Sequence, residues 1–74
     1  MNIHIGKEIR KRLDESRGCS VVWFAKQLSC SRTNAYKIFE KDHIDTEMLW
    51  RISDVLNYDF FKLISDQFAK NNRH

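Results

Sequence analysis

Apolar residues recur along this chain at the three- and four-residue spacings of amphipathic helices. Near the start, Ile5, Ile9 and Leu13 are four residues apart and predict one buried stripe on a helix. No run of residues alternates in the Val/Ile/Thr-rich manner of a strand, and the chain contains no proline. We therefore expect an all-α fold, a compact five-helix bundle with short connections. The predicted helices span about 3–16, 20–28, 31–40, 45–56 and 60–70.

Residues with the chemistry of helix ends separate these periodic segments. Gly18 is expected to follow the first helix with a positive φ, and Ser20 to cap the second. Asp45 and Asp59 are expected to cap the last two helices, and Asn57 to end the fourth in a left-handed conformation.

The length of 74 residues indicates one domain over 1–74, with a folded core of about 3–70. The C-terminal tail, 71–74, is expected to be frayed. No stretch is long and apolar enough to span a membrane, and the N-terminus lacks the layout of a signal peptide. A cytoplasmic location is the expectation.

The stretch Ser20–Glu40 predicts two short helices joined by a tight turn at Ser29-Cys30-Ser31. Ala25 is small enough to let the second helix cross close over the first. The outer side of the second helix carries hydrogen-bond donors and one tyrosine. This is the pattern of a helix-turn-helix, whose second helix enters the major groove of DNA.

The distribution of charge supports a polyanionic partner. Residues 1–41 hold nine Lys/Arg and four Asp/Glu, whereas residues 42–74 hold four Lys/Arg and six Asp/Glu, for a net charge of +3. A basic front and an acidic back orient a protein toward nucleic acid, although Lys and Arg are also common on any solvated helical surface.

The sequence gives no indication of an enzyme or of a bound metal. No Ser/His/Asp grouping and no glycine-rich phosphate loop is present, and no cofactor is expected. Cys19 and Cys30, with His4 and His43, do not have the spacing of a compact zinc hairpin. Cys30 is expected to be a small core residue in the turn, and Cys19 a loop residue.

Three segments in order resemble a known family: I-G-K-E-I-R, F-A-K-Q-L-S-C-S-R-T and L-W-R-I-S-D-V-L-N-Y-D-F-F-K-L-I. From Ile5 to Ile64 the chain resembles the phage repressor/Cro-like (XRE-type) helix-turn-helix domain. The resemblance implies a five-helix, lambda-repressor-like fold that binds operator DNA, generally as a symmetric dimer, and regulates transcription.

Three positions depart from the family pattern. Val21 stands where many members have a glutamine that steadies a phosphate contact. The family often pairs an arginine of the first helix with a glutamate late in the recognition helix, and the corresponding positions here are identified as Leu13 and Phe39. An apolar pair can replace a buried ion pair at little cost, so the change is physically coherent.

The N-terminal half of a recognition helix reaches base edges, which places Arg32 and Thr33 first among the DNA-contacting residues. Arg32 can fork onto guanine or grip a phosphate, and Lys37 is expected to contact a phosphate. Tyr36 either faces the groove or packs against its own helix, and Asn34 is a candidate for the DNA backbone. The flanking candidates for phosphate contacts are Lys26, Ser29, Ser31, Lys41 and His43.

Aromatic residues leave two readings open. Trp23 and Phe61 either extend the core or join Trp50 and Phe68 in a dimer seam or partner patch.

The sequence thus predicts a DNA-binding transcription regulator that binds double-stranded DNA as a homodimer and acts by occupancy, since the five helices leave no ligand-sensing domain. The alternative is a protein-interaction module, an antitoxin or assembly adaptor, that holds a protein partner with an aromatic surface. A third reading is a helical domain that has lost its groove contacts, which Val21 suggests.

Overall fold

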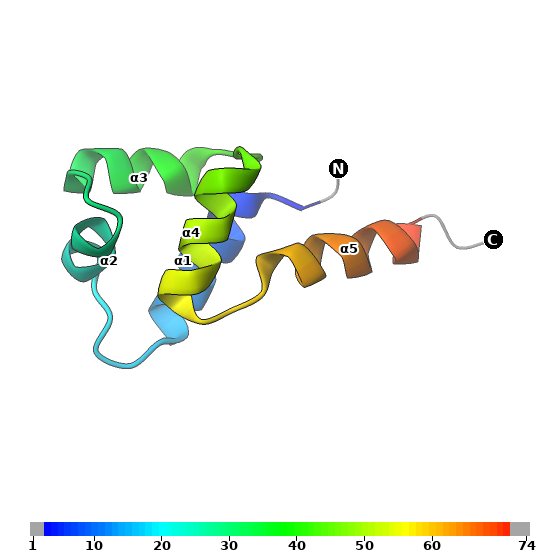
Figure 1. The fold of residues 1–74 in the computed structure, drawn as a ribbon, viewed down its shortest axis with the longest axis horizontal. Coiled ribbons are helices and arrows are strands. Elements are labelled where there is room, and N and C mark those ends of the chain that lie inside the picture. The colour runs from blue at the N-terminus through cyan, green and yellow to red at the C-terminus, as the bar shows by residue number, and fades with distance from the viewer. Residues whose placement is uncertain (1–2, 72–74) are drawn as a thin grey trace.

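The structure, a computed structural model, describes residues 3–71 and is all-helical in that range, with five helices and no strand. The all-α prediction is therefore confirmed, and no helix of the described range is long and apolar enough to cross a membrane. Asn71, predicted to be frayed, is helical, and residues 72–74 of the predicted tail lie outside the described range. The helices, shown in Figure 1, are α1 (Ile5–Glu15), α2 (Val21–Gln27), α3 (Arg32–Glu40), α4 (Thr46–Leu56) and α5 (Phe60–Asn71).

Each helix begins where a side chain accepts a hydrogen bond from a free N–H of the first turn. The prediction that the first helix starts at Ile3 is wrong by two residues, because the imidazole Nδ1 of His4 accepts from the N–H of Lys7 at 3.1 Å and fixes the start at Ile5. The other four helices use hydroxyl or carboxylate caps, and those of α2, α4 and α5 stand at the predicted positions. These caps are Ser20, Ser31, Asp45 and Asp59.

Two predicted left-handed residues are confirmed. Gly18 has φ +74° in the loop after α1, and Asn57 has φ +50° at the end of α4. The N–H of Tyr58 bonds to the carbonyl of Ser53 at 3.0 Å, so the turn after Asn57 satisfies the last carbonyls of α4.

The hydrophobic core lies between α1, α2, α3 and α4, and Phe60 from the start of α5 closes it. Ile9, Phe24, Ala35, Ile52 and Phe60 are fully buried, as the helical spacing of apolar residues predicts. No charged or polar residue is buried in the described range. Trp23 and Phe61 are half-buried, and their buried parts pack against this core, as the core reading predicts.

Helix α5 projects away from the other four helices (Figure 1). Phe60 is its one buried residue, and the molecule measures 43 × 22 × 18 Å. Leu63 and Ile64 are half-buried, whereas Phe68 is 67% exposed. The outer turns of α5 therefore have little of the core to pack against.

Candidate nucleic-acid interface

The turn between α2 and α3 is a Schellman-type helix end. The N–H of Cys30 donates to the carbonyl of Ala25 at 2.9 Å, and the N–H of Ser29 donates to the carbonyl of Lys26 at 3.1 Å. Ser29 is left-handed, with φ +56°, a conformation that favours glycine. Its side chain is thus turned out to solvent rather than capping α3, so of the two serines in the turn Ser31 is the cap.

Arg51, on the neighbouring helix α4, stabilises this turn with a side-chain hydrogen bond. Its Nη2 donates to the carbonyl of Leu28 at 3.0 Å, across 23 residues of sequence. Leu28 is the C-cap residue of α2, and its carbonyl has no partner within the helix. The guanidinium therefore satisfies a carbonyl that the helix leaves unbonded. Sequence reasoning missed Arg51, because nothing local distinguishes it from a solvated arginine.

Helix α3 faces the core with one edge and solvent with the other. Ala35 is fully buried and Ile38 is 7% exposed, while Ser31 caps the first turn by accepting from the N–H of Asn34 at 3.1 Å. The N–H groups of Arg32 and Thr33, in the same turn, have no acceptor within the helix.

Every residue predicted to contact DNA is exposed. The arginine, lysine and hydroxyl side chains of the outer face stand on α3, in the turn, on α2 and in the loop after α3. The exposed candidates are Lys26, Ser29, Ser31, Arg32, Thr33, Asn34, Tyr36, Lys37, Lys41 and His43.

Glu40 is a carboxylate on the same outer side of α3. It lies four residues after Tyr36 and three after Lys37, which are the spacings of helix-face neighbours, and it is exposed. Its negative charge disfavours an anion beside the last turn of α3.

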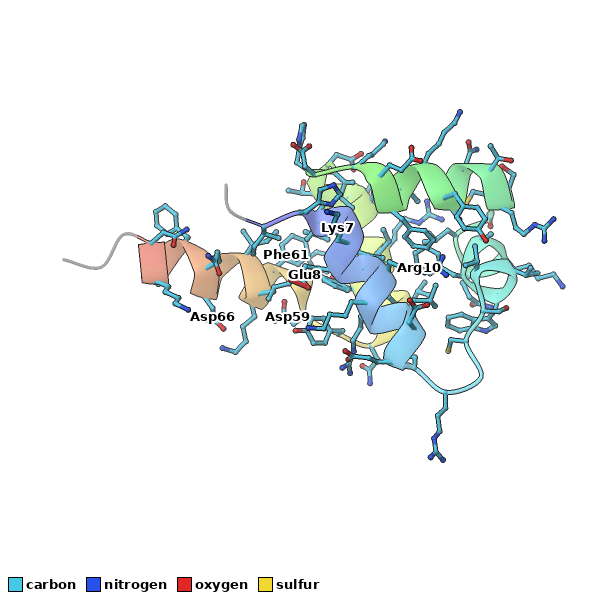
Figure 2. All side chains as sticks on the ribbon, turned by 180° about the vertical axis from the view of Figure 1, so that it is seen from behind. Lys7, Glu8, Arg10, Asp59, Phe61 and Asp66 are labelled. Carbon is cyan, nitrogen blue, oxygen red and sulfur yellow. The ribbon has the colours of Figure 1, made fainter. Side chains whose placement is uncertain are left out.

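An aromatic and cationic cluster joins α3 to α1 and α2. The Phe39 ring stacks on Phe24 of α2 with centroids 5.6 Å apart, and Tyr36 meets its edge at 6.0 Å. The guanidinium of Arg10 lies 5.1 Å from the Phe39 centroid and 5.9 Å from that of Tyr36. Figure 2 shows Arg10 on the side of α1 toward α2 and α3. Tyr36 therefore packs partly on its own helix, although 49% of it is exposed.

Leu13, identified from the sequence as the residue of α1 that pairs with Phe39, lies one turn beyond Arg10. The Arg10 guanidinium lies over the Phe39 ring, and its Nε is 3.1 Å from a carboxylate oxygen of Asp14. Leu13 is a core residue, 1% exposed. The face of the Phe39 ring is thus a partner of this arginine of the first helix.

The far end of α3 is fixed against the start of α1. The N–H of Gly6 donates to the carbonyl of Lys41 at 2.8 Å, and the N–H of Ile5 donates to that of Asp42 at 3.1 Å. A Cβ on Gly6 would meet the carbonyl oxygens of Ile38, Phe39 and Lys41 within 2.6 Å. Only glycine permits this approach, which sets the direction of α3.

The loop after α3 carries a hydrogen-bonded acid and imidazole. Nδ1 of His43 lies 2.8 Å from Oδ1 of Asp42, and this hydrogen bond, together with the positive charge of His43, lowers the pKa of the Asp42 carboxyl below its usual 3.8. His43 is therefore engaged with a carboxylate beside Lys41, which reduces its value as a phosphate contact.

The sulfur and imidazole groups do not assemble into a site. Cys19 and Cys30 are free thiols, both half-buried, and both pack against the core. Within residues 3–71 no group of three His, Cys, Asp or Glu side chains is placed to hold a metal ion.

Comparisons with protein-family models, with curated proteins and with solved structures find no match to this chain.

Proposed function

We propose that this chain is a sequence-specific DNA-binding transcriptional regulator of the phage repressor/Cro-like type, in which α2 and α3 act as a helix-turn-helix and α3 enters the major groove. The observation that carries the proposal is that every polar candidate on the outer side of α3 and its turn is exposed. The helix itself is held in place by Arg51 at the turn, by Arg10 over Phe39 and by the hydrogen bond from Gly6 at the far end. A rigid, exposed helix with cationic side chains is what major-groove reading needs.

Within this proposal the exposed residues have different roles. Arg32 and Thr33, in the first turn of α3, read base edges, and Lys37 contacts a phosphate one turn later. The hydroxyls of Ser29 and Ser31 and the free N–H groups of the first turn meet a phosphate at the start of the helix. Lys26 and Lys41 add phosphate contacts at either side.

The proposed DNA complex contains two copies of the chain. One copy offers few phosphate contacts, so tight binding requires a two-fold site with half-sites about one helical turn apart. The action is occupancy of an operator in the cytoplasm, without a cofactor and without catalysis.

A salt titration tests the proposal. Sequences selected from a random DNA pool are expected to bind with an affinity that falls steeply with salt, by a slope of about 0.9 per phosphate contact. Arg32→Ala is expected to weaken binding to the selected site by roughly fivefold to 150-fold, equivalent to about 1–3 kcal/mol, and to relax preference at one base position.

Lys37→Ala is expected to lower the salt slope by about one while leaving sequence preference intact. Lys70→Ala, on the projecting helix α5, is the matched control and should leave both quantities unchanged. If the Arg32→Ala variant binds DNA as well as the parent chain, the fold has lost its groove contacts. Val21, at the position where many members of the family have a glutamine, suggests this reading.

A second function is favoured by one observation. Trp50 of α4 is 70% exposed beside Phe61 of α5, and such a surface suits a protein-interaction module, an antitoxin or an assembly adaptor. This function predicts no DNA binding even at low salt, together with recovery of a protein partner that Trp50→Ala releases.

A further inference from the structure

Two aromatic side chains are left partly uncovered where α4 meets α5. Trp50 of α4 is 70% exposed, and its ring meets that of Phe61 of α5 edge to face, with centroids 6.1 Å apart. Two open hollows, of about 670 and 460 Å³, share these two rings as part of their walls. None of the residues predicted to contact DNA lines either hollow, so this surface is separate from the proposed DNA interface.

Carboxylates flank the exposed tryptophan along α4. Glu47 lies three residues before Trp50 and Asp54 four residues after it, which are the spacings of neighbours on one face of a helix. Asp54 lines the larger hollow and Glu47 the smaller one. Asp59 adds a third carboxylate to the larger hollow, and Figure 2 shows it beside Phe61 at the start of α5.

In the described part of the chain, the carboxylates of Glu47 and Asp54 have no basic partner. Within residues 3–71 no ion pair includes either of them, and no lysine, arginine or histidine lines either hollow. Arg51, one helical turn from Glu47, donates instead to the carbonyl of Leu28. The surface thus combines an exposed aromatic face with negative charge, and a cation is the chemical group that this combination attracts.

We propose that the acidic aromatic surface, formed by Glu47, Trp50, Asp54 and Phe61, binds an arginine-bearing basic segment of a protein partner. A planar guanidinium can stack on the Trp50 ring while its N–H groups fork onto the carboxylate of Asp54, one turn away. Lysine fits less well, because its ammonium neither stacks flat on a ring nor binds a carboxylate in two places. A polyanion is repelled by the same carboxylates.

The chain itself contains the same kind of contact on α1. The guanidinium of Arg10 lies 5.1 Å from the centroid of the Phe39 ring and pairs with Asp14 at 3.1 Å. Arg12 likewise lies 4.5 Å from the centroid of the Tyr58 ring and pairs with a carboxylate one turn along its helix. The acidic aromatic surface offers the ring and the carboxylate of such a contact, and the arginine is left for a partner to supply.

The proposed partner chemistry rests on the second proposed function, the protein-interaction module, and names the class of group that the partner presents. Its test needs neither DNA nor the partner itself. A failed peptide titration therefore removes the preference for arginine, whereas the salt dependence of DNA binding and the recovery of a partner through Trp50 are judged by their own experiments.

Heteronuclear NMR of the full chain follows the binding of short peptides. The chain has two tryptophans, so the indole N–H signal of Trp50 reports on the surface, and that of Trp23, on α2, is an internal control. The peptide Gly-Arg-Gly-Arg-Gly, acetylated and amidated, is expected to shift the Trp50 signal with a dissociation constant of roughly 1 mM, as befits a short flexible ligand.

Two further peptides separate arginine recognition from charge. The same peptide with lysine in place of arginine is expected to bind about threefold more weakly or worse, because it loses the stacking and the fork. The peptide with citrulline, which is planar but uncharged, is expected to cause no saturable shift.

Variants of the chain locate the contact. Asp54→Asn is expected to weaken binding of the arginine peptide by about threefold or more. Asp66→Asn is the matched control, because it removes the same charge from α5 outside both hollows, and it should change binding by less than about 1.5-fold. Trp50→Ala, followed through the backbone amides of α4, should abolish the saturable shifts.

Circular dichroism of each variant confirms that the helices are retained. Equal binding of the arginine and lysine peptides overturns the proposal, since charge alone would then govern binding. So does an unshifted Trp50 signal, or a loss from Asp54→Asn no larger than that from Asp66→Asn. A Trp50 signal that moves on dilution without peptide, and not on adding peptide, assigns the surface to a second copy and overturns the proposal as well.

Discussion

The backbone N–H of Gly6 donates to the carbonyl of Lys41 at 2.8 Å, and this hydrogen bond joins the first turn of α1 to the C-cap residue of α3. Free N–H groups at a helix start and free carbonyls at a helix end satisfy one another here. The contact also leaves no room for a Cβ on Gly6. One glycine therefore determines how α3 is presented.

Gly6→Ala is expected to destabilise the protein by about 2–4 kcal/mol, since the methyl group pushes apart backbone atoms that cannot yield and weakens two hydrogen bonds. Thermal unfolding followed by circular dichroism measures the effect. Gly18→Ala is the comparison, because a Cβ there meets nothing within 4 Å and only its φ of +74° opposes the change, at about 1–2 kcal/mol. Equal losses for the two variants would contradict the close approach of α1 and α3.

Ser29→Gly is expected to stabilise the chain by about 0.5–1 kcal/mol. Ser29 has φ +56° in the turn between α2 and α3, where glycine avoids the steric cost of a Cβ. Chemical denaturation should show a higher midpoint with an unchanged slope. Ser29→Ala keeps the Cβ and should not stabilise, so a gain in that variant would indicate a cause other than the backbone conformation.

Phe39→Leu is expected to cost about 1–2 kcal/mol, because leucine keeps most of the volume but loses the stacking on Phe24 and the face presented to Arg10. A double-mutant cycle with Arg10→Met isolates the interaction between the cation and the ring. We expect a coupling of about 0.5–1 kcal/mol, and additive single effects would show that Arg10 and Phe39 are neighbours without being partners.

Glu40→Gln is expected to strengthen DNA binding by roughly threefold or more at low salt, and by less at high salt, because it removes a carboxylate from the outer side of α3. Fluorescence anisotropy with a selected DNA site measures the change. Glu15→Gln makes the same change in net charge at the end of α1 and should have a smaller effect. Equal gains from both would mean that net charge, rather than the α3 surface, governs binding.

The Asp42 carboxyl is expected to titrate below 3.8, since the hydrogen bond and the charge of His43 favour its ionised form. Its contribution to stability is present above the unfolded value of 3.8 and is lost as the pH falls through the lower folded pKa. Carbon-detected NMR titration follows the carboxyl directly. His43→Ala should return the pKa toward 3.8, and an unchanged titration would remove His43 as the cause.

The sequence by itself determined the helices and most of their boundaries. The caps at Ser20, Ser31, Asp45 and Asp59 and the left-handed Asn57 are local features, in which a side chain or backbone group bonds only a few residues away. The exposure of the α3 candidates follows from the same local periodicity, because Ala35 and Ile38 fix which edge faces inward.

Only the tertiary structure decided which distant residues meet. Arg51 reaches the carbonyl of Leu28 across 23 residues, and the guanidinium of Arg10 lies over the Phe39 ring. The direction of α5, which leaves Trp50 exposed beside Phe61, also depends on how whole helices pack. Helical periodicity identifies the inward edge of each element, but the partner of a side chain is set by the relative placement of helices, to which no local pattern corresponds.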